Sequence, residues 1–473
     1  MTARSLLSLL VLLCACTREL PPAGQVVLYI DTDTIVPERA GTPADPARLS
    51  PLVDRARVEV LLDGQVQPNS TRDFVLDAEM FRRNEVSFGV VPPPGNPNVT
   101  VRVVLFRVDR VIDGAIEPGV SLETIVALPP VAEDGINEVS ITMKTDDFGT
   151  KVGPIAPQPG RPSTSLVNTW RGGRRASCAG VPRPGEACVP GGSFFFGDPQ
   201  FRGRTASQDI YEERLVIVSP FFLDLTEVTV AEFRKALPGL QARGVEAPKP
   251  WSGQVRPNTT DNTDFCTWTD EPNPLRDNLA LNCITRNAAR EYCRDFGKDL
   301  PTEAQMEFVM SGLGEEWAFP WGNDEPNCDA AVWGRAGLGA FRDDPQNCRK
   351  AGTEGGPTFP RQGTSDTLND VVLRNAGGES IADLGGNLSE WMQDIWARPT
   401  DAFWKTTRPM IDPVNVTISP DEGEGYSIRG GNWTFSALTT RAAFRRRRLV
   451  TDELYSAGIG FRCARSGLAA GGG

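Results

Sequence analysis

Cysteine and carboxylate side chains carry most of the chemistry that this 473-residue chain could perform, because it contains no histidine. That absence excludes Ser-His-Asp and Cys-His catalysis, zinc sites with imidazole ligands, and iron sites built from two histidines and a carboxylate. Ten cysteines are present, and eight of them lie between Cys178 and Cys463. Whether these eight are reactive thiols or disulfides depends first on the compartment to which the chain is sent.

The first residues, MTARSLLSLLVLLCAC, have the pattern of an export signal. Arg4 supplies a positive start, and the apolar run that follows is too short to span a bilayer. The LCAC end is similar to the lipobox of bacterial lipoproteins, in which a small residue precedes the lipidated cysteine; Cys16 fits that position better than Cys14. The alternative is an ordinary secretory signal with an incidental cysteine. We therefore predict a signal peptide over residues 1–15, lipidation of Cys16, and a tether over residues 16–24.

Lipidation would anchor the mature protein to a membrane. We expect this to be the outer membrane, or another membrane position that faces the periplasm or the cell surface. Thr17, directly after the candidate cysteine, goes more often with the outer than the inner membrane in lipoproteins of this pattern. An even number of cysteines in an exported chain predicts disulfides, all of them in the second half. The net charge of −12 argues against nucleic acid as a partner, since phosphate binding needs a basic surface.

The segments that follow the tether predict β-structure. QVVLYIDTD, RARVEVLLDG, NVTVRVVLFRVDRV and NEVSITMKT are rich in Val, Ile and Leu and are separated by turn residues. Residues 25–148 are therefore predicted to form an all-β sandwich. Residues 149–177 contain four prolines and five glycines, which predicts a linker.

The sequence pattern changes at Cys178. From here on, the chain has the signals for helices and disulfides that would position a functional site. Cys178 and Cys188 flank a Pro/Gly loop, which predicts a local disulfide. Capping boxes at TEVTVAEFRKAL (Thr229) and PTEAQMEF (Thr302) predict two helices, and NCITRNAAREYCRDFG predicts another between them. The chain as a whole is thus predicted to be α+β.

Several motifs occur in an order that resembles the sulfatase-modifying factor family, whose founding members are the formylglycine-generating enzymes. These are CVPGGSFFFGD, SPFFLDLTEVTVAEFRKA, REYCRDFGKDLPTEAQMEFVMSG, FPWGND, DLGGNLSEW, RGGNW and GFRCAR. The resemblance covers residues 178–466, leaving 467–473 as a tail. It implies a loop-rich fold related to C-type lectins, and a disulfide between Cys293 and Cys463. Proximity in sequence pairs Cys266 with Cys283 and Cys328 with Cys348, although sequence alone does not prove connectivity.

Enzymes of the family hold copper with two cysteines after the Gly-Gly-polar-aromatic motif and oxidise a substrate cysteine to formylglycine. Thiolates suit Cu(I) because both are soft. The corresponding positions here are Phe435 and Thr440, so a copper cofactor is not expected. The branch that uses non-haem iron needs histidine ligands, which this chain lacks.

The resemblance also implies a calcium ion at the DLGGNLSEW loop. Its ligands would be the Asp383 side chain, the carbonyls of Gly386 and Leu388, and the Glu390 carboxylate. Calcium accepts such irregular oxygen donors. The alternative is that Glu390 pairs with an arginine and the glycines serve a tight turn.

Two interpretations of function remain open from the sequence. In the first, the protein is a catalytically inactive binding or structural module, with an envelope peptide or glycan as ligand and Asn432, Trp433, Phe435 and Thr440 lining a remnant cleft. In the second, it performs formylglycine-type oxidation or another peptide-tailoring reaction without the cysteine pair. Two converging carboxylates in the cleft would favour the second interpretation.

Overall fold

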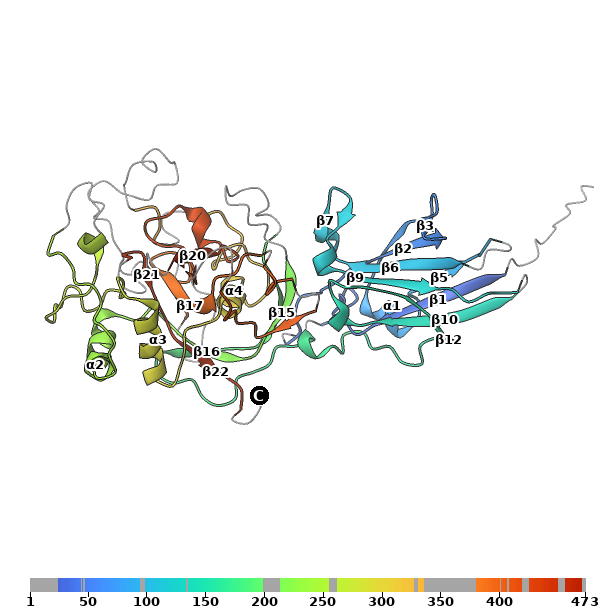
Figure 1. Ribbon diagram of the computed structural model, residues 1–473. Coiled ribbons are helices and arrows are strands. Elements are labelled where there is room, and N and C mark those ends of the chain that lie inside the picture. The colour runs from blue at the N-terminus through green and yellow to red at the C-terminus, as the bar shows by residue number, and fades with distance from the viewer. Residues whose placement is uncertain are drawn as a thin grey trace, which may run out of the picture.

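The chain folds into two domains joined end to end, as the computed structural model shows (Figure 1). The structure describes residues 24–43, 45, 47–93, 98–132, 135–198, 213–254, 262–326, 331–335, 380–399, 401–405, 408–418, 425–449 and 456–469. Cys16, Cys328, Cys348 and the expected signal peptide therefore lie outside the described residues. No helix within these ranges is both long and apolar enough to cross a membrane.

The first domain is a β-sandwich, as its sequence pattern predicts. One sheet has the order β12-β10-β1-β5, with β1 (Gln25–Thr32), β5 (Ser87–Val90), β10 (Ile136–Met143) and β12 (Gln158–Pro159). The other has the order β11-β9-β6-β2-β3, with β2 (Arg55–Leu62), β3 (Gln65–Val66), β6 (Val99–Phe106), β9 (Leu122–Ala127) and β11 (Lys151–Ile155). A sixth strand, β4 (Arg72–Val75), also pairs with β2. The short helix α1 (Ala78–Arg82), the 3-10 helix η1 (Val108–Arg110) and the hairpin of β7 (Val111–Ile112) and β8 (Ala115–Ile116) complete the domain.

Alternation along the strands builds its core. Val26, Leu28 and Ile30 of β1 point into a cluster that also takes Val101 and Val103 from the facing sheet. Side chains two apart in a strand share a face, so one face of each sheet is apolar and buried.

Residues 149–177 are packed on the first domain, which corrects their interpretation as a linker. β11 pairs in parallel with β9, and β12 pairs with β10. Val167 and Trp170 are buried in the sandwich core, and the Trp170 indole donates a hydrogen bond to Asp146. Proline and glycine content predicts an irregular path, but it does not reveal that apolar residues within the segment bury themselves against strands distant in sequence.

In its described residues, the second domain consists of three small sheets, three α-helices, short 3-10 helices and loops. Its sheets are β13-β16-β22, β14-β15-β18 and β20-β19-β17-β21. Their strands are β13 (Glu186–Val189), β14 (Gly192–Phe196), β15 (Arg214–Val218), β16 (Phe221–Asp224), β17 (Ser389–Ile395), β18 (Met410–Ile411), β19 (Gly425–Arg429), β20 (Arg446–Leu449), β21 (Ile459–Gly460) and β22 (Ala464–Ser466). The helices are α2 (Val230–Gln241), α3 (Arg286–Asp295) and α4 (Glu303–Met310). The α+β class predicted from sequence is confirmed.

Local signals for the helices and disulfides are also confirmed. Thr229 and Thr302 both form capping boxes, which satisfy backbone N–H groups that a helix start leaves without partners. Three predicted disulfides are present: Cys178–Cys188, Cys266–Cys283 and Cys293–Cys463. The last ties α3 to the end of the closing segment, which we define as residues 429–463.

The two domains share apolar packing where they meet. Phe195 of β14 and Leu215 of β15 belong to the same buried cluster as the core of the first domain. The rings of Phe195 and Phe148 lie 5.9 Å apart. The first domain is therefore completed by residues of the second, and the junction is a packed interface.

Candidate functional site

The DLGGNLSEW loop leads directly into β17, and its glycine turn is required by close packing. Gly386 has φ +107°, a conformation that side chains disfavour, and a Cβ there would come within 2.8 Å of the Val332 carbonyl oxygen. Its N–H donates to the Gly430 carbonyl at 2.7 Å, so the loop is attached to the start of the closing segment.

Glu390 forms a buried ion pair with Arg462 of the GFRC motif. The Arg462 Nε donates to both carboxylate oxygens at 2.8 and 2.9 Å. Its Nη2 donates to the carbonyls of Ala382 and Asp383 at 2.8 and 2.9 Å. The two side chains are 1% and 0% exposed, so the pair is shielded from water and salt. The sequence left open whether Glu390 pairs with an arginine. In the structure it does, and the arginine is Arg462.

A third buried carboxylate, Glu227, also approaches this loop. It accepts hydrogen bonds from Asn387 Nδ2 at 2.5 Å and from the Leu388 N–H at 3.0 Å. Burial raises the pKa of Glu227 well above its ordinary value, and the negative charges of Asp383 and Glu390 raise it further. The pKa of Glu390 is raised as well, by burial that Arg462 offsets only in part.

Among the described residues, Glu227, Asp383 and Glu390 all lie close enough to Arg462 to interact with its charge. Sequence reasoning missed Glu227 and Arg462, although both lie within motifs that it quoted, TEVTV and GFRC. Across the described ranges, no three His, Cys, Asp or Glu side chains are arranged to hold a metal ion together. A calcium ion here would depend on the carbonyls of Gly386 and Leu388 besides the Asp383 side chain.

The two positions that hold copper-binding cysteines in the related enzymes have other structural roles. The Phe435 ring lies under the Arg446 guanidinium, 4.1 Å from the ring centroid. Thr440 is fully buried at the end of the 3-10 helix η8 (Ala437–Thr440), where its hydroxyl donates to the Ala437 carbonyl at 2.7 Å. Neither side chain is a thiolate or presents a free donor.

Asn432 and Trp433 are buried parts of the packing rather than an open lining. Asn432 donates to the Ser389 hydroxyl at 3.0 Å and accepts from the N–H and hydroxyl of Thr434. The Trp433 indole donates to the Ala457 carbonyl at 2.9 Å, and its ring packs on Phe265. The structure places both residues beside the Phe435 segment, with their hydrogen-bonding groups already used.

Two further arginines of the closing segment bind carboxylates of α4. Arg445 pairs with Glu303 at 2.6 Å, and Arg429 pairs with Glu307. All four side chains are at most 2% exposed. The closing segment is therefore fixed to the domain by buried charge pairs as well as by Cys463.

Comparison with known proteins agrees with this architecture. Residues 175–467 match the family described as the sulfatase-modifying factor enzyme 1-like domain. Because the match covers more than half of the chain, the protein belongs to this family.

Individual relatives include both active and inactive proteins. The chain is 24% identical over 314 residues to the formylglycine-generating enzyme of Streptomyces coelicolor, covering 59% of this chain and 88% of the relative. It is 26% identical over 302 residues to inactive C-alpha-formylglycine-generating enzyme 2 of Bos taurus, covering 58% and 86%. Among solved structures, PvdO from Pseudomonas aeruginosa aligns with a TM-score of 0.39 and 22% identity, over 60% of this chain and all of that one.

Proposed function

We propose that this protein is an exported, lipid-anchored binding or structural module that uses the family scaffold without its oxidase chemistry. The observation that carries the proposal is the environment of Phe435 and Thr440. A phenyl ring does not ligate copper, and a buried threonine hydroxyl that donates to a carbonyl is a hard, weakly acidic group unsuited to Cu(I).

Competition for Cu(I) against a chromophoric chelator tests this proposal. The wild-type protein is expected to withdraw no copper from the chelator, and the six cysteines that are paired in the described residues offer no free thiolates. The double variant Phe435→Cys/Thr440→Cys is the matched comparison, because it restores two thiols at the family positions. Tight Cu(I) binding by the wild-type protein with its disulfides intact would overturn the proposal.

A calcium ion at the DLGGNLSEW loop is part of the same proposal. It is supported by the kind of donors that the family resemblance assigns to this loop, the Asp383 side chain and the Gly386 and Leu388 carbonyls, which are oxygen ligands that calcium accepts. Asp383→Asn keeps the shape of the side chain and removes its charge. Calcium is expected to raise the melting temperature of the wild type and to raise that of the variant less. Equal melting temperatures with calcium and with a chelator, for the wild type, would refute this part.

The lipid anchor at Cys16 rests on the signal pattern of the first sixteen residues. Growth with a labelled fatty acid is expected to label the wild-type protein and not Cys16→Ser. Label that persists in the variant would contradict the assignment.

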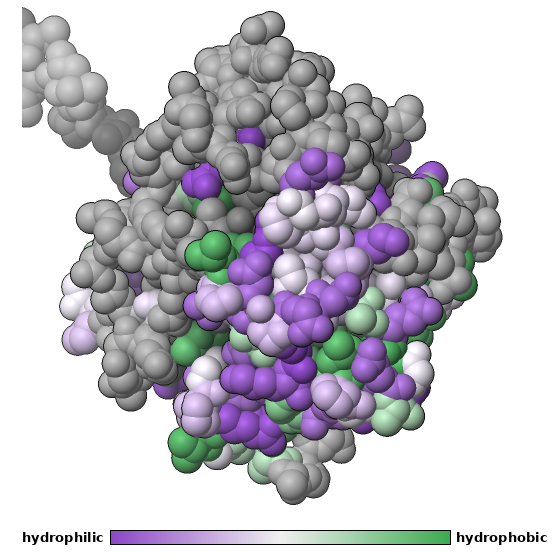
Figure 2. All heavy atoms as spheres, turned by 90° about the vertical axis from the view of Figure 1, so that its left-hand side faces the viewer, coloured by the Kyte–Doolittle hydropathy of each residue, from purple (hydrophilic) through white to green (hydrophobic). Residues whose placement is uncertain are grey.

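An envelope peptide or glycan is the proposed class of ligand. Among the residues coloured in Figure 2, the face of the second domain that points away from the first is mostly polar, with small separate apolar patches. Such a surface suits hydrogen-bonded recognition better than burial of a large apolar partner. Binding to arrays of peptidoglycan fragments and envelope peptides tests this class.

A further inference from the structure

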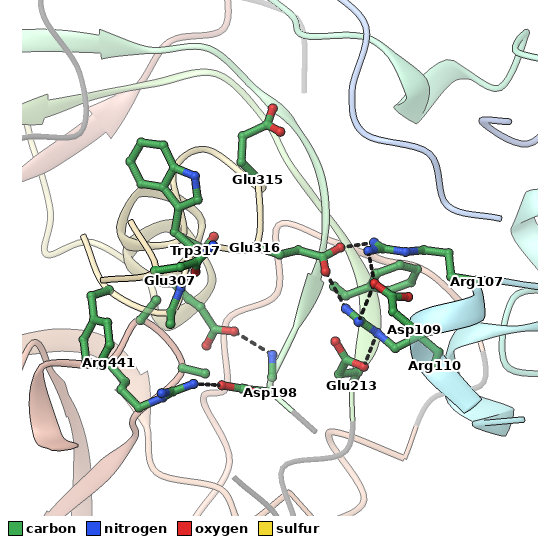
Figure 3. A pocket seen from close by; sticks show the side chains of 18 of the residues that line it. Arg107, Asp109, Arg110, Asp198, Glu213, Glu307, Glu315, Glu316, Trp317 and Arg441 are labelled. Carbon is green, nitrogen blue, oxygen red and sulfur yellow. Dashed lines mark hydrogen bonds and ion pairs between the residues drawn. The ribbon is translucent and has the colours of Figure 1, made fainter. Parts of the chain in front are cut away.

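A cavity of about 440 Å³ lies at the junction of the two domains. Figure 3 shows that η1 and the residue before it approach the cavity from the first domain, and that the end of β14, the residue before β15, and α4 with the turn after it approach it from the second. Its volume is within the range of small-molecule sites. Phe435, Thr440 and the DLGGNLSEW loop do not line it, although Arg441, the residue after Thr440, does.

The lining of this junction cavity carries more negative than positive side chains. Seven carboxylates face three guanidiniums; they are Asp109, Asp198, Glu213, Glu307, Glu315, Glu316 and Glu325, against Arg107, Arg110 and Arg441. Two arginines outside the lining, Arg175 and Arg429, pair with Glu315 and Glu307. Among the described residues, seven carboxylates therefore stand against five guanidiniums.

Of the buried carboxylates in the lining, Glu213 has the least-used hydrogen-bonding capacity. Its side chain is 2% exposed, and its one charged partner among the described residues is Arg110, with Nε 2.7 Å from Oε2. The two groups are not aligned as donor and acceptor, so both atoms are buried without a hydrogen bond. Arg110 instead directs its Nη2 at Glu316 at 2.5 Å (Figure 3). A buried carboxylate oxygen that accepts no hydrogen bond is costly even beside a guanidinium, and a bound donor would reduce that cost.

The electrostatic state of Glu213 agrees with a missing positive charge. Burial raises the pKa of Glu213 to about 8; Arg110 opposes this shift, while the negative charges of Glu316 and Asp198 add to it. The carboxyl group is therefore largely protonated at neutral pH until a cation enters.

The rest of the lining favours an organic cation. Phe195, Trp317 and Phe319 border the cavity, and two of these rings already lie beneath guanidiniums. Arg110 is 5.8 Å from the Phe195 centroid, and Arg441 is 5.2 Å from that of Phe319. Aromatic faces attract cations that are weakly hydrated. An anion would meet the surplus carboxylates, and within the described ranges no cluster suits a metal ion.

We propose that the junction cavity binds an alkylguanidinium or alkylammonium group, which donates hydrogen bonds to Glu213 and lies against the aromatic lining. The site requires both domains, because Arg107 and Arg110 come from the first and Glu213 and Glu316 from the second. It does not depend on the absence of oxidase chemistry. It also gives the β-sandwich a role, which is to supply one wall of the site.

Calorimetric titration with N-acetyl-arginine amide tests the site, using protein that contains both domains. N-acetyl-citrulline amide has nearly the same shape without the charge and is expected not to bind. The guanidinium stays charged throughout the range from pH 6 to 9, so any pH dependence belongs to the protein. Because the ligand displaces one proton from Glu213, affinity is expected to rise about tenfold per pH unit below pH 8 and to level off above it.

Glu213→Gln is expected to weaken binding by about tenfold to a hundredfold and to abolish its pH dependence. Glu123→Gln is the matched control, because Glu123 pairs with Arg102 in the first domain, away from the cavity. This variant should bind N-acetyl-arginine amide with the same affinity as the wild type. Melting curves show that each variant folds. Equal binding of the arginine and citrulline derivatives, no binding of any cation tested, or an unchanged affinity in Glu213→Gln would overturn the proposal.

Agmatine provides the second arm of the experiment. Agmatine carries a guanidinium and an ammonium group without a peptide backbone, so tighter binding of agmatine than of the arginine amide would identify a small free dication as the preferred ligand. The reverse order would identify an arginine side chain of a peptide. In both cases Glu213→Gln must remove most of the affinity.

Discussion

Arg462 provides the sharpest test of how the second domain is held together, through the variant Arg462→Met. Methionine fills similar volume but leaves Glu390 buried with no partner and removes the donor to the Ala382 and Asp383 carbonyls. Removing one member of a fully buried ion pair costs about 3–5 kcal/mol, since the remaining charge has neither water nor a counter-charge. That loss is a large share of the roughly 5–15 kcal/mol that typically stabilises a domain.

The assay is chemical denaturation with disulfides intact, followed by tryptophan fluorescence. Arg290→Met is the matched control, because Arg290 makes an equally close two-pronged contact with Asp299, at 2.7 and 2.8 Å, but is 26% exposed. An exposed pair of this kind contributes about 1 kcal/mol or less. If Arg462→Met lowers the free energy of unfolding no more than Arg290→Met does, burial does not make the Glu390–Arg462 pair important to stability, and the reasoning is wrong. Replacing Glu390 and Arg462 together by apolar residues should recover part of the loss.

Two further predictions concern the same domain. Replacing Cys293 and Cys463 by serine opens a loop with a sequence separation of 170, which should lower the free energy of unfolding by about 5 kcal/mol in the chain-entropy account; a change below about 1 kcal/mol in denaturant titrations would contradict it. Burial alone would raise the pKa of Glu186, but hydrogen bonds from Arg465 and Lys298 outweigh burial and lower it to about 2. Because this folded-state pKa lies below the unfolded value of 4.5, the stabilisation is fully present above pH 4.5 and is lost as the pH falls towards 2, by about 3 kcal/mol in total. Glu186→Gln should therefore flatten the loss of stability in this acid range, and an unchanged acid profile would refute the assignment.

Features of the second domain that depend on short stretches of sequence could be predicted. The capping boxes at Thr229 and Thr302 need residues only three apart. The cysteine pairs follow from proximity or from the family resemblance, as does the position of the glycine turn at Gly386. These features depend on residues close together in sequence or on motifs that occur in a fixed order, so the sequence alone is enough to predict them.

Long-range partners could not be predicted. Glu390 and Arg462 are separated by 72 residues, and the parallel pairing of β17 with β21 helps to bring them together. Nothing in their neighbourhoods in sequence indicates which carboxylate an arginine will meet. The buried positions of Asn432 and Trp433 likewise depend on packing across the domain.

The junction of the domains was missed for a related reason. Residues 149–177 have the composition of a linker, but Val167 and Trp170 are buried in the sandwich core, and β11 and β12 add hydrogen-bonded strands to its sheets. Burial and strand pairing together offset the entropy lost when the segment is ordered. Once that segment is packed, Arg110 meets Glu213 and Glu316. How domains dock depends on complementary surfaces, which periodicity and spacing do not reveal.

The central claim, that the family scaffold in this protein lacks oxidase activity, is tested most directly by incubating purified protein with Cu(I), oxygen and a cysteine-containing sulfatase peptide. An active formylglycine-generating enzyme serves as the positive control, and mass spectrometry detects the aldehyde. We predict that the peptide cysteine is unchanged while the control converts it. Repeated turnover of peptide to formylglycine by this protein would contradict the claim.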